Sequence, residues 1–371
     1  MARIDLVDLA HSYDGDRAEP DSYALKPMSM TWRQGGAYAL LGPSGCGKTT
    51  LLNLISGIVA PSHGQILFDG KDVTRLSTQK RNIAQVFQFP VIYDTMTVAQ
   101  NLAFPLHNRG VEPGEIRTRV ARIAELLDLT PYLHRKATRL TADAKQKISL
   151  GRGLVRSDVA AILFDEPLTV IDPHLKWELR SKLKALHREL DLTMIYVTHD
   201  QTEALTFADT VVVMHDGRVV QSGTPAELFD KPAHTFVGYF IGSPGMNIVP
   251  AQVSGDEARI SGHPIKLGRA YDRLPHGARI EIGVRPEFVC VGQPSPELLS
   301  VAIERIDDLG RVRFARVRIG DVRFAARVPA GFSISGSQAG LMFDPTRVHV
   351  YADGRLVEGS PQGATISAGV A

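Results

Sequence analysis

The stretch Gly42-Pro43-Ser44-Gly45-Cys46-Gly47-Lys48-Thr49-Thr50 joins a short apolar strand to the start of a helix. Residues 36–41 predict the strand, and apolar residues at helical spacing over 51–55 predict the buried face of the helix. Glycine-rich loops in this position wrap phosphates with backbone N–H groups, and the positive helix end adds to the attraction. Lys48 would reach the β- and γ-phosphates, and Thr49 would offer its hydroxyl to Mg²⁺. A chance glycine loop is the alternative, against which the flanking strand and helix argue.

Two adjacent carboxylates end a second apolar segment. Asp165 and Glu166 follow residues 160–164. Because side chains alternate along a strand, the two carboxylates have different roles. We expect Asp165 to hold Mg²⁺ through water and Glu166 to polarise the attacking water. An acidic strand end that is merely solvated is the alternative.

His199 follows the next apolar segment, residues 193–197. Hydrolysis needs a polar group that senses the γ-phosphate, and a strand end beside Glu166 is a suitable place for it. A lone histidine is more often a surface or core residue, but the order and spacing of the segments favour a functional one. The other histidines show no metal-ligand spacing.

The chain divides into two regions of different pattern. Over residues 1–235 strand-like and helix-like segments alternate, which is typical of an α/β fold with a mostly parallel sheet, and residues from about 90 to 157 predict an inserted helical subdomain. Asp172 would cap a helix whose leucines at 175, 179, 183, 186 and 190 form one stripe. Residues 236–371 predict a small all-β domain, with 360–371 frayed.

Composition excludes several classes of protein. The length of 371 residues suggests two or three domains, and 42 Lys and Arg against 40 Asp and Glu make no electrostatic case for nucleic acid as the main partner. Two cysteines exclude a disulfide scaffold and suit a reducing compartment. No apolar run approaches the ~18 residues that a spanning helix needs, and the start has no apolar segment typical of a signal peptide. We expect a cytoplasmic protein that reaches a membrane only by docking onto other subunits.

These motifs resemble the ATP-binding subunits of ABC transporters, most closely those of importers of the maltose and glycerol-phosphate type. The resemblance covers nearly the whole chain. It implies that Tyr13 stacks on adenine, a packing tyrosine being the alternative, and that Gln88 contacts Mg²⁺ and responds to the membrane subunits. It also implies that Asp172 lies in a loop crossing the dimer interface. Residues 283–287 and 343–345 match landmarks of the family's OB-like regulatory domain.

One motif departs from the family pattern. The family signature reads Leu-Ser-Gly-Gly-Gln at a helix start, whereas this chain has Leu140-Thr141-Ala142-Asp143-Ala144. In the family this helix start binds the γ-phosphate of ATP held on the partner subunit. Ala142 and Asp143 add side chains where glycines allow close approach, and Asp143 itself compensates the positive helix end. A like charge ~4 Å from the phosphate would cost about 4 kcal/mol at an effective dielectric of ~20. A shifted loop that leaves both sites working is the alternative.

The resemblance therefore implies an ATPase that drives import of a sugar, polyol or glycerol phosphate from the cytoplasmic face of the cell membrane. Its catalytic residues would be Lys48, Gln88, Glu166 and His199, with MgATP as the bound nucleotide. Its partners would be permease subunits, indirectly an extracytoplasmic solute-binding protein, and a second ATP-binding subunit. A heterodimer is favoured, because a homodimer would contain two impaired sites.

Two other interpretations remain. A regulatory subunit that binds ATP with little turnover is favoured by the altered signature, but Glu166 and His199 argue against it. An ABC-type ATPase of translation or repair is disfavoured because such proteins often carry two cassettes in one chain.

Two lesser features of the sequence each allow two interpretations. Cys46 is either reactive or inert, and the arginine-rich residues 301–331 form either an anion-binding surface or a solvated sheet face.

Overall fold

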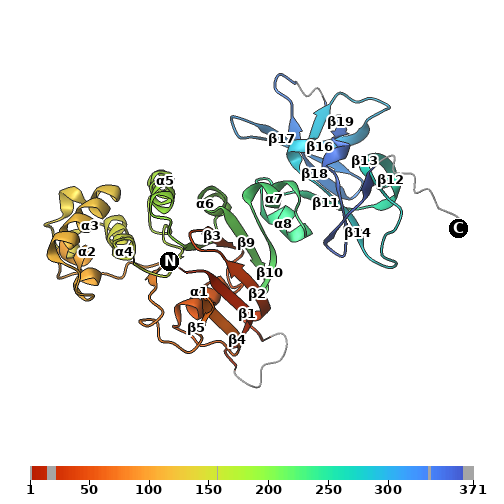
Figure 1. Ribbon diagram of the computed structural model, residues 1–371. Helices are drawn as coiled ribbons and strands as arrows, with labels where there is room; N and C mark the ends of the chain where they lie inside the picture. The colour runs from red at the N-terminus through yellow and green to blue at the C-terminus, as the bar shows by residue number, and fades with distance from the viewer. Residues whose placement is uncertain (1, 15–21, 157, 333–335, 362–371) are drawn as a thin grey trace. The chain divides into compact units, whose positions relative to one another are not determined.

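The computed structural model describes residues 2–14, 22–156, 158–332 and 336–361. The chain forms two compact units, Met1–Pro225 and Ala226–Ala371. The first unit mixes helices and strands, and the second consists mainly of strands (Figure 1). No helix in the described ranges is long and apolar enough to span a membrane.

The first unit is built on a six-stranded sheet in the order β10-β9-β3-β8-β7-β6. All neighbouring strands from β9 to β6 pair in parallel, and only β10 is antiparallel. The bounds are β3 Ala37–Leu41, β6 Ala84–Val86, β7 Ile162–Asp165, β8 Met194–Thr198, β9 Thr210–His215 and β10 Arg218–Gly223. Because the parallel strands all end at one edge, the residues that follow β3, β7 and β8 are brought together there.

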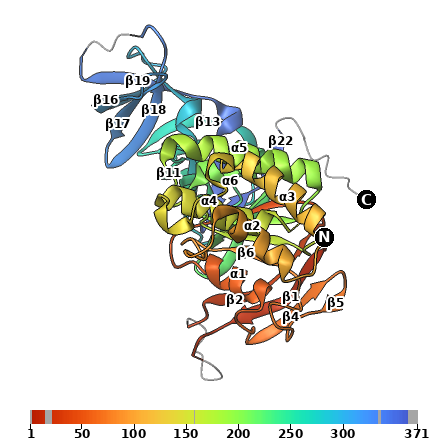
Figure 2. The same cartoon turned by 90° about the vertical axis from the view of Figure 1, so that its left-hand side faces the viewer.

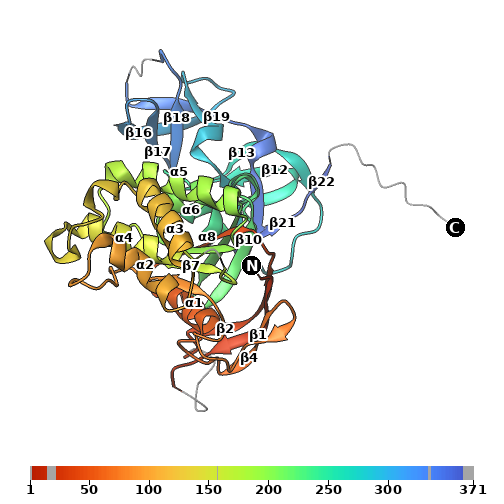
Figure 3. The ribbon, with the colours of Figure 1, turned by 60° about the vertical axis from the view of Figure 1, so that its left-hand side comes forward.

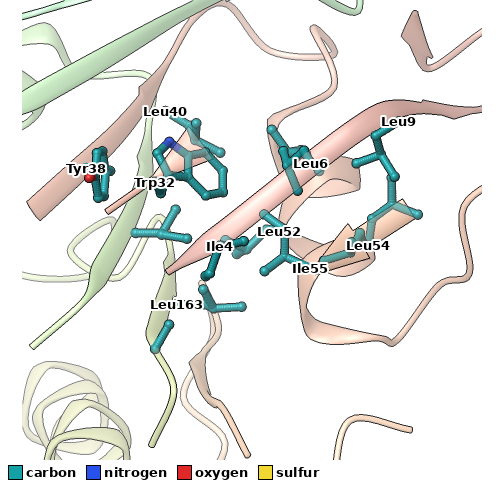
Figure 4. Close-up of a cluster of buried hydrophobic side chains, with 14 of the residues drawn as sticks. Ile4, Leu6, Leu9, Trp32, Tyr38, Leu40, Leu52, Leu54, Ile55 and Leu163 are labelled. Carbon is teal, nitrogen blue, oxygen red and sulfur yellow. The ribbon is translucent and has the colours of Figure 1, made fainter. Parts of the chain in front are cut away.

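A second sheet is antiparallel and has the order β2-β1-β4-β5, and it shares a buried cluster with the helix that follows β3. Its strands are β1 Ile4–His11, β2 Leu25–Trp32, β4 His63–Phe68 and β5 Lys71–Asp72. Helix α1, Lys48–Ser56, contributes Leu52, Leu54 and Ile55 to a buried cluster shared with β1, β3 and β7 (Figure 4). Burial of each such side chain stabilises the fold by roughly 1.5–3 kcal/mol, so α1 and its preceding loop are held firmly.

A group of three helices forms the predicted helical subdomain (Figures 1 and 2). The helices are α2 Val98–His107, α3 Pro113–Leu126 and α4 Ala142–Leu154. Thr97 and Gln100 form a reciprocal capping box at the start of α2. In α3 the apolar residues Ile116, Val120 and Ile123 recur at helical spacing and are buried.

Helices α5, Pro173–Leu190, and α6, Gln201–Phe207, follow the ends of β7 and β8. The predicted leucine stripe of α5 is confirmed in the middle, where Leu179, Leu183 and Leu186 are buried. It is wrong at the ends, because Leu175 is 37% exposed and Leu190 is only half-buried. Apolar spacing identifies the inward face of a helix, but burial also requires a neighbouring element over each turn.

The second unit is a small β domain that contains a closed five-stranded barrel in the order β15-β18-β17-β16-β19, as the all-β prediction requires. A four-stranded sheet, β11-β14-β20-β21, and a three-stranded sheet, β12-β13-β22, accompany it. The bounds are α7 Pro225–Asp230, α8 Thr235–Phe240, β11 Asn247–Pro250, β12 Gln252–Ile260, β13 His263–Tyr271, β14 Ile280–Val284, β15 Val289–Gly292, β16 Leu299–Asp308, β17 Arg313–Ile319, β18 Val322–Val328, β19 Gln338–Phe343, β20 His349–Ala352, β21 Arg355–Val357 and β22 Ser360–Pro361.

One sequence expectation for this unit needs correction. Residues 360–361 are not frayed, because they pair with Arg269 and Ala270 of β13. The rest of the predicted frayed end, 362–371, lies outside the described residues.

Candidate functional site

The loop between β3 and α1 has a backbone that only glycine fits at two positions. Gly47 has φ +99°, a left-handed conformation, and a Cβ on Gly42 would lie 2.3 Å from the carbonyl oxygen of Met214. Lys48 is 5% exposed, and its Nζ donates to the carbonyl oxygens of Gly42 and Pro43, both at 2.9 Å. The loop therefore wraps around the ammonium group of Lys48.

The N-terminus of α1 is open to an anion. Gly47 is its N-cap, and within the described residues no side chain caps this helix end and no acidic residue stands in its first turn. Free N–H groups and the helix dipole together attract negative charge. The predicted phosphate-binding geometry of residues 42–50 thus has a structural basis.

Thr49 and Asp165 place two oxygen donors side by side at the sheet edge. The hydroxyl of Thr49 donates to Oδ1 of Asp165 at 3.1 Å. Burial raises the pKa of Asp165, as does neighbouring Glu166, whereas the hydrogen bond from Thr49 and the charge of Lys48 lower it. Hydroxyl and carboxylate oxygens are the donor types that Mg²⁺ prefers, so this pair fits the predicted metal site.

Glu166 and His199 meet at the same edge. Nδ1 of His199 lies 3.1 Å from Oε2 of Glu166, and the histidine side chain is 56% exposed. Glu166 has φ +45°, and its N–H donates to the carbonyl oxygen of Val197 at 3.0 Å. Left-handed conformations of non-glycine residues are strained by about 1–3 kcal/mol and are concentrated at functional sites. The two residues predicted to act on the attacking water and the γ-phosphate are therefore adjacent.

Of the two other predicted site residues, Tyr13 lies beside α1 and Gln88 lies in the segment after β6. The Tyr13 ring is 63% exposed, packs edge-on against His11 at 4.6 Å, and has its hydroxyl 3.3 Å from Oγ1 of Thr50. An exposed ring beside α1 suits stacking on a base. Gln88 follows β6, and in the part of the chain that the structure describes no hydrogen bond joins it to Thr49 or Asp165.

Cys46 is buried within the phosphate-binding loop, with 3% exposure. Burial raises the pKa of its thiol, although the nearby Lys48 lowers it in part. A thiol that is buried and protonated is a poor nucleophile. The structure therefore favours the inert reading of this residue.

The altered signature residues lie on the helical subdomain, apart from the sheet edge in the fold. Thr141 is the N-cap of α4, and its hydroxyl accepts from the N–H of Ala144 at 3.4 Å. Asp143 stands in the first turn, and its Oδ1 is buried without a hydrogen-bond partner among the described residues. Asp172 is the N-cap of α5 and accepts from the N–H of His174 at 2.9 Å. The helix start that would face a partner's phosphate thus carries its own cap and its own carboxylate.

Several arginines of the barrel pair with two carboxylates on β16. Asp307 pairs with Arg305 and Arg316, and Glu304 pairs with Arg318 and Arg323. Shared carboxylates between neighbouring arginines are typical of a solvated sheet face. This pairing favours the solvated-face reading of residues 301–331.

Sequence analysis did not identify Glu203, a buried acidic residue on α6 that is 4% exposed. It lies four residues after His199 and accepts hydrogen bonds from Tyr196 and Thr198. One signal was available, because Glu203 and the apolar Phe207 are one helical turn apart and must share a face.

The loop at residues 42–50, with Thr49, Asp165, Glu166 and His199 around it, defines a P-loop nucleoside triphosphatase. The family model described as ABC transporter matches residues 25–169, and the model described as MalK OB fold domain matches residues 242–289. The trehalose/maltose import ATP-binding protein MalK of Thermococcus litoralis is 39% identical over 370 residues, which cover 95% of this chain and 98% of that protein. The chain belongs to the family of ATP-binding subunits of ABC transporters.

Other relatives agree with this assignment. The sn-glycerol-3-phosphate import ATP-binding protein UgpC of Paracoccus denitrificans is 36% identical over 364 residues, covering 97% of this chain and 100% of that protein. The structure of cbiO1 from Clostridium perfringens, part of the ABC transporter complex cbiONQ, matches with a TM-score of 0.55 and 30% identity. The match covers 62% of this chain and 90% of the cbiO1 chain, as expected for a protein that shares the ATPase unit.

Proposed function

We propose that this chain hydrolyses MgATP to drive import of a sugar, polyol or glycerol phosphate through separate membrane subunits. The observation that carries the proposal is the pairing of Glu166 with His199 at 3.1 Å beside the pair Thr49 and Asp165, also at 3.1 Å. An ATPase needs both a metal-binding pair and a group that orients water, and all four residues lie at one sheet edge. The relatives that match over nearly their whole length are import ATP-binding proteins. This likeness supports an ATP-hydrolysing subunit over a regulatory subunit with little turnover.

Each residue of the site has a distinct role in this proposal. The loop backbone and Lys48 bind the phosphates, and Tyr13 stacks on the adenine. Thr49, Asp165 and Gln88 would hold Mg²⁺, and the bound ion would neutralise charge on the phosphates. Glu166 accepts a proton from the attacking water, and His199 contacts the γ-phosphate and holds the carboxylate of Glu166 in place.

The partners follow from the same assignment. The membrane subunits are separate chains, and they bind this chain on the cytoplasmic face of the cell membrane. A solute-binding protein outside the cell acts indirectly. The β domain, residues 236–371, is the regulatory module, and the ATPase domain is 1–235 with its helical subdomain at about 90–157.

We infer a heterodimer with unequal sites from the start of α4. Thr141 caps this helix and Asp143 places a carboxylate in its first turn, so the end that would receive a partner's phosphate is occupied by the chain's own groups. Ala142 and Ala144 also replace residues that would allow backbone approach and hydrogen bonding. A partner that carries an intact signature would complete the ATP site on this chain, with Asp172 at the interface between them.

Two substitutions in the assembled transporter test the proposed chemistry. Glu166→Gln should lower ATP turnover by about 100-fold or more, with ATP binding nearly unchanged, because the attacking water loses its orienting carboxylate. Lys48→Ala should weaken ATP binding itself, since the loop loses the ammonium that reaches the phosphates. Turnover and equilibrium nucleotide binding measured on the same preparations separate the two effects. Wild-type turnover in the Glu166→Gln protein would refute the role of Glu166.

A further inference from the structure

A buried carboxylate lies directly behind the turn that carries His199. Glu203, on α6, is 4% exposed, and its Oε2 accepts from the hydroxyls of Tyr196 at 3.1 Å and Thr198 at 2.9 Å. Its Oε1 lies 3.4 Å from Nζ of Lys176 on α5. Buried carboxylates are costly unless they are paired, and these donors pair both oxygens of Glu203.

The hydrogen bonds of Thr198 continue from Glu203 to the far side of His199. Oγ1 of Thr198 donates to Glu203 and accepts from the N–H of Asp200 at 3.0 Å. The carboxylate of Asp200 in turn accepts from the N–H groups of Thr202 at 2.7 Å and Glu203 at 3.3 Å. The residues immediately before and after His199 are therefore both tied to the start of α6.

The same carboxylate reaches the start of α5. Lys176 stands in the first turn of that helix, and its backbone N–H donates to the carbonyl oxygen of Asp172 at 3.1 Å. Helices α5 and α6 lie side by side (Figures 2 and 3). Glu203 is thus bonded to the turn of His199 on one side and to the helix that Asp172 caps on the other.

We propose that Glu203 is a positioning residue for ATP hydrolysis, which holds the His199 turn in register with the start of α5. This inference rests on the proposed function, because it assumes that His199 acts on the γ-phosphate. Among the described residues no hydrogen bond or ion pair joins Glu203 to the phosphate-binding loop, so its loss should misplace His199 without weakening ATP binding. The effect acts through Thr198, because this neighbour of His199 is bonded both to the carboxylate of Glu203 and to Asp200, the neighbour on the other side.

A matched pair of substitutions separates positioning from simple stability. Tyr196→Phe and Thr198→Val each remove one hydroxyl that donates to Oε2 of Glu203, and both residues are buried, at 0% and 2% exposure. In the assembled transporter, Thr198→Val should lower kcat about tenfold with KM for ATP unchanged within about twofold. Tyr196→Phe should change kcat by less than about twofold, although it also removes a buried hydroxyl that donates to Glu203. Unlike Tyr196→Phe, Thr198→Val also removes the acceptor of the Asp200 N–H, which is the link to the far side of His199. Thr198→Ser retains the hydroxyl and should have a kcat close to that of the wild-type protein.

Glu203→Gln gives the direct test. It should lower kcat at least as much as Thr198→Val, again with KM for ATP nearly unchanged. Equal loss of kcat in Tyr196→Phe and Thr198→Val, or lowered thermal stability with unchanged kcat in both Thr198→Val and Glu203→Gln, would overturn the positioning role. Glu166→Gln in the same assay reports on the proposed function separately. If that variant is inactive while Thr198→Val is fully active, the proposed function stands and only the role of Glu203 fails.

Discussion

Helices α1 and α4 begin in opposite chemical ways. Helix α1 follows Gly47, which has a left-handed backbone, and in the described residues it has no side-chain cap and no acid in its first turn. Helix α4 follows Thr141, whose hydroxyl accepts from the N–H of Ala144, and it carries Asp143 in its first turn. One helix end leaves its N–H groups for an external anion, whereas the other is partly satisfied by its own side chains.

The difference predicts that the vacant N-terminus of α1 attracts an anion more strongly than the N-terminus of α4 does. The dipole is present at both ends, but a cap and a carboxylate at α4 reduce what it offers to a ligand. A ligand can also approach the backbone more closely at α1 than at α4, because a glycine precedes α1 whereas Ala142 and Asp143 begin α4. We therefore expect nucleotide to bind firmly at α1 and weakly at α4.

The largest expected effect is an asymmetry between two glutamate changes in a mixed dimer. Glu166→Gln in this chain should lower turnover by about 100-fold or more, because in the proposed heterodimer this chain's ATP would be completed by the partner's intact signature. The equivalent change in the partner should be much milder, since the partner's ATP faces α4 of this chain. Steady-state ATPase rates of the two mixed dimers measure the difference. Equal losses would show that α4 supports hydrolysis as well as a normal signature does.

A smaller effect is expected when α4 is made to resemble the family signature. The combined changes Thr141→Ser, Ala142→Gly, Asp143→Gly and Ala144→Gln should raise the ATPase rate of this chain alone by about tenfold, because they remove the carboxylate and reopen the backbone. Asp143→Asn isolates the charge, and it should give part of the gain. High activity of the unmodified homodimer would contradict the reasoning from Asp143.

The smallest effect concerns the cap itself. Thr141→Ala should lower the free energy of unfolding by about 1 kcal/mol, because the N–H of Ala144 loses its acceptor. Thr97→Ala removes the equivalent cap from α2 and should cost a similar amount. Denaturant unfolding measures both. Only Thr141→Ala should also alter the partner's ATP site, so a change in partner-site turnover with Thr97→Ala would indicate that subdomain stability is responsible.

Sequence patterns were sufficient where the chemistry is local. The loop at residues 42–50 is recognisable because its glycines, lysine and threonine lie within one short stretch of chain, and the predicted cap at Asp172 is equally local. The departure of Thr141 to Ala144 from the family signature was also visible in the sequence, although the self-capping hydrogen bond was not.

Tertiary structure alone decided which residues meet and which are buried. Thr49 and Asp165 lie 116 positions apart in the chain, and their contact exists only because β3, β8 and β7 are neighbours in one sheet. Leu175 and Glu203 each departed from what their residue types suggest, the leucine being exposed and the glutamate buried. A sequence pattern reports the face that a segment turns inward, whereas burial and pairing depend on the segment that packs against it.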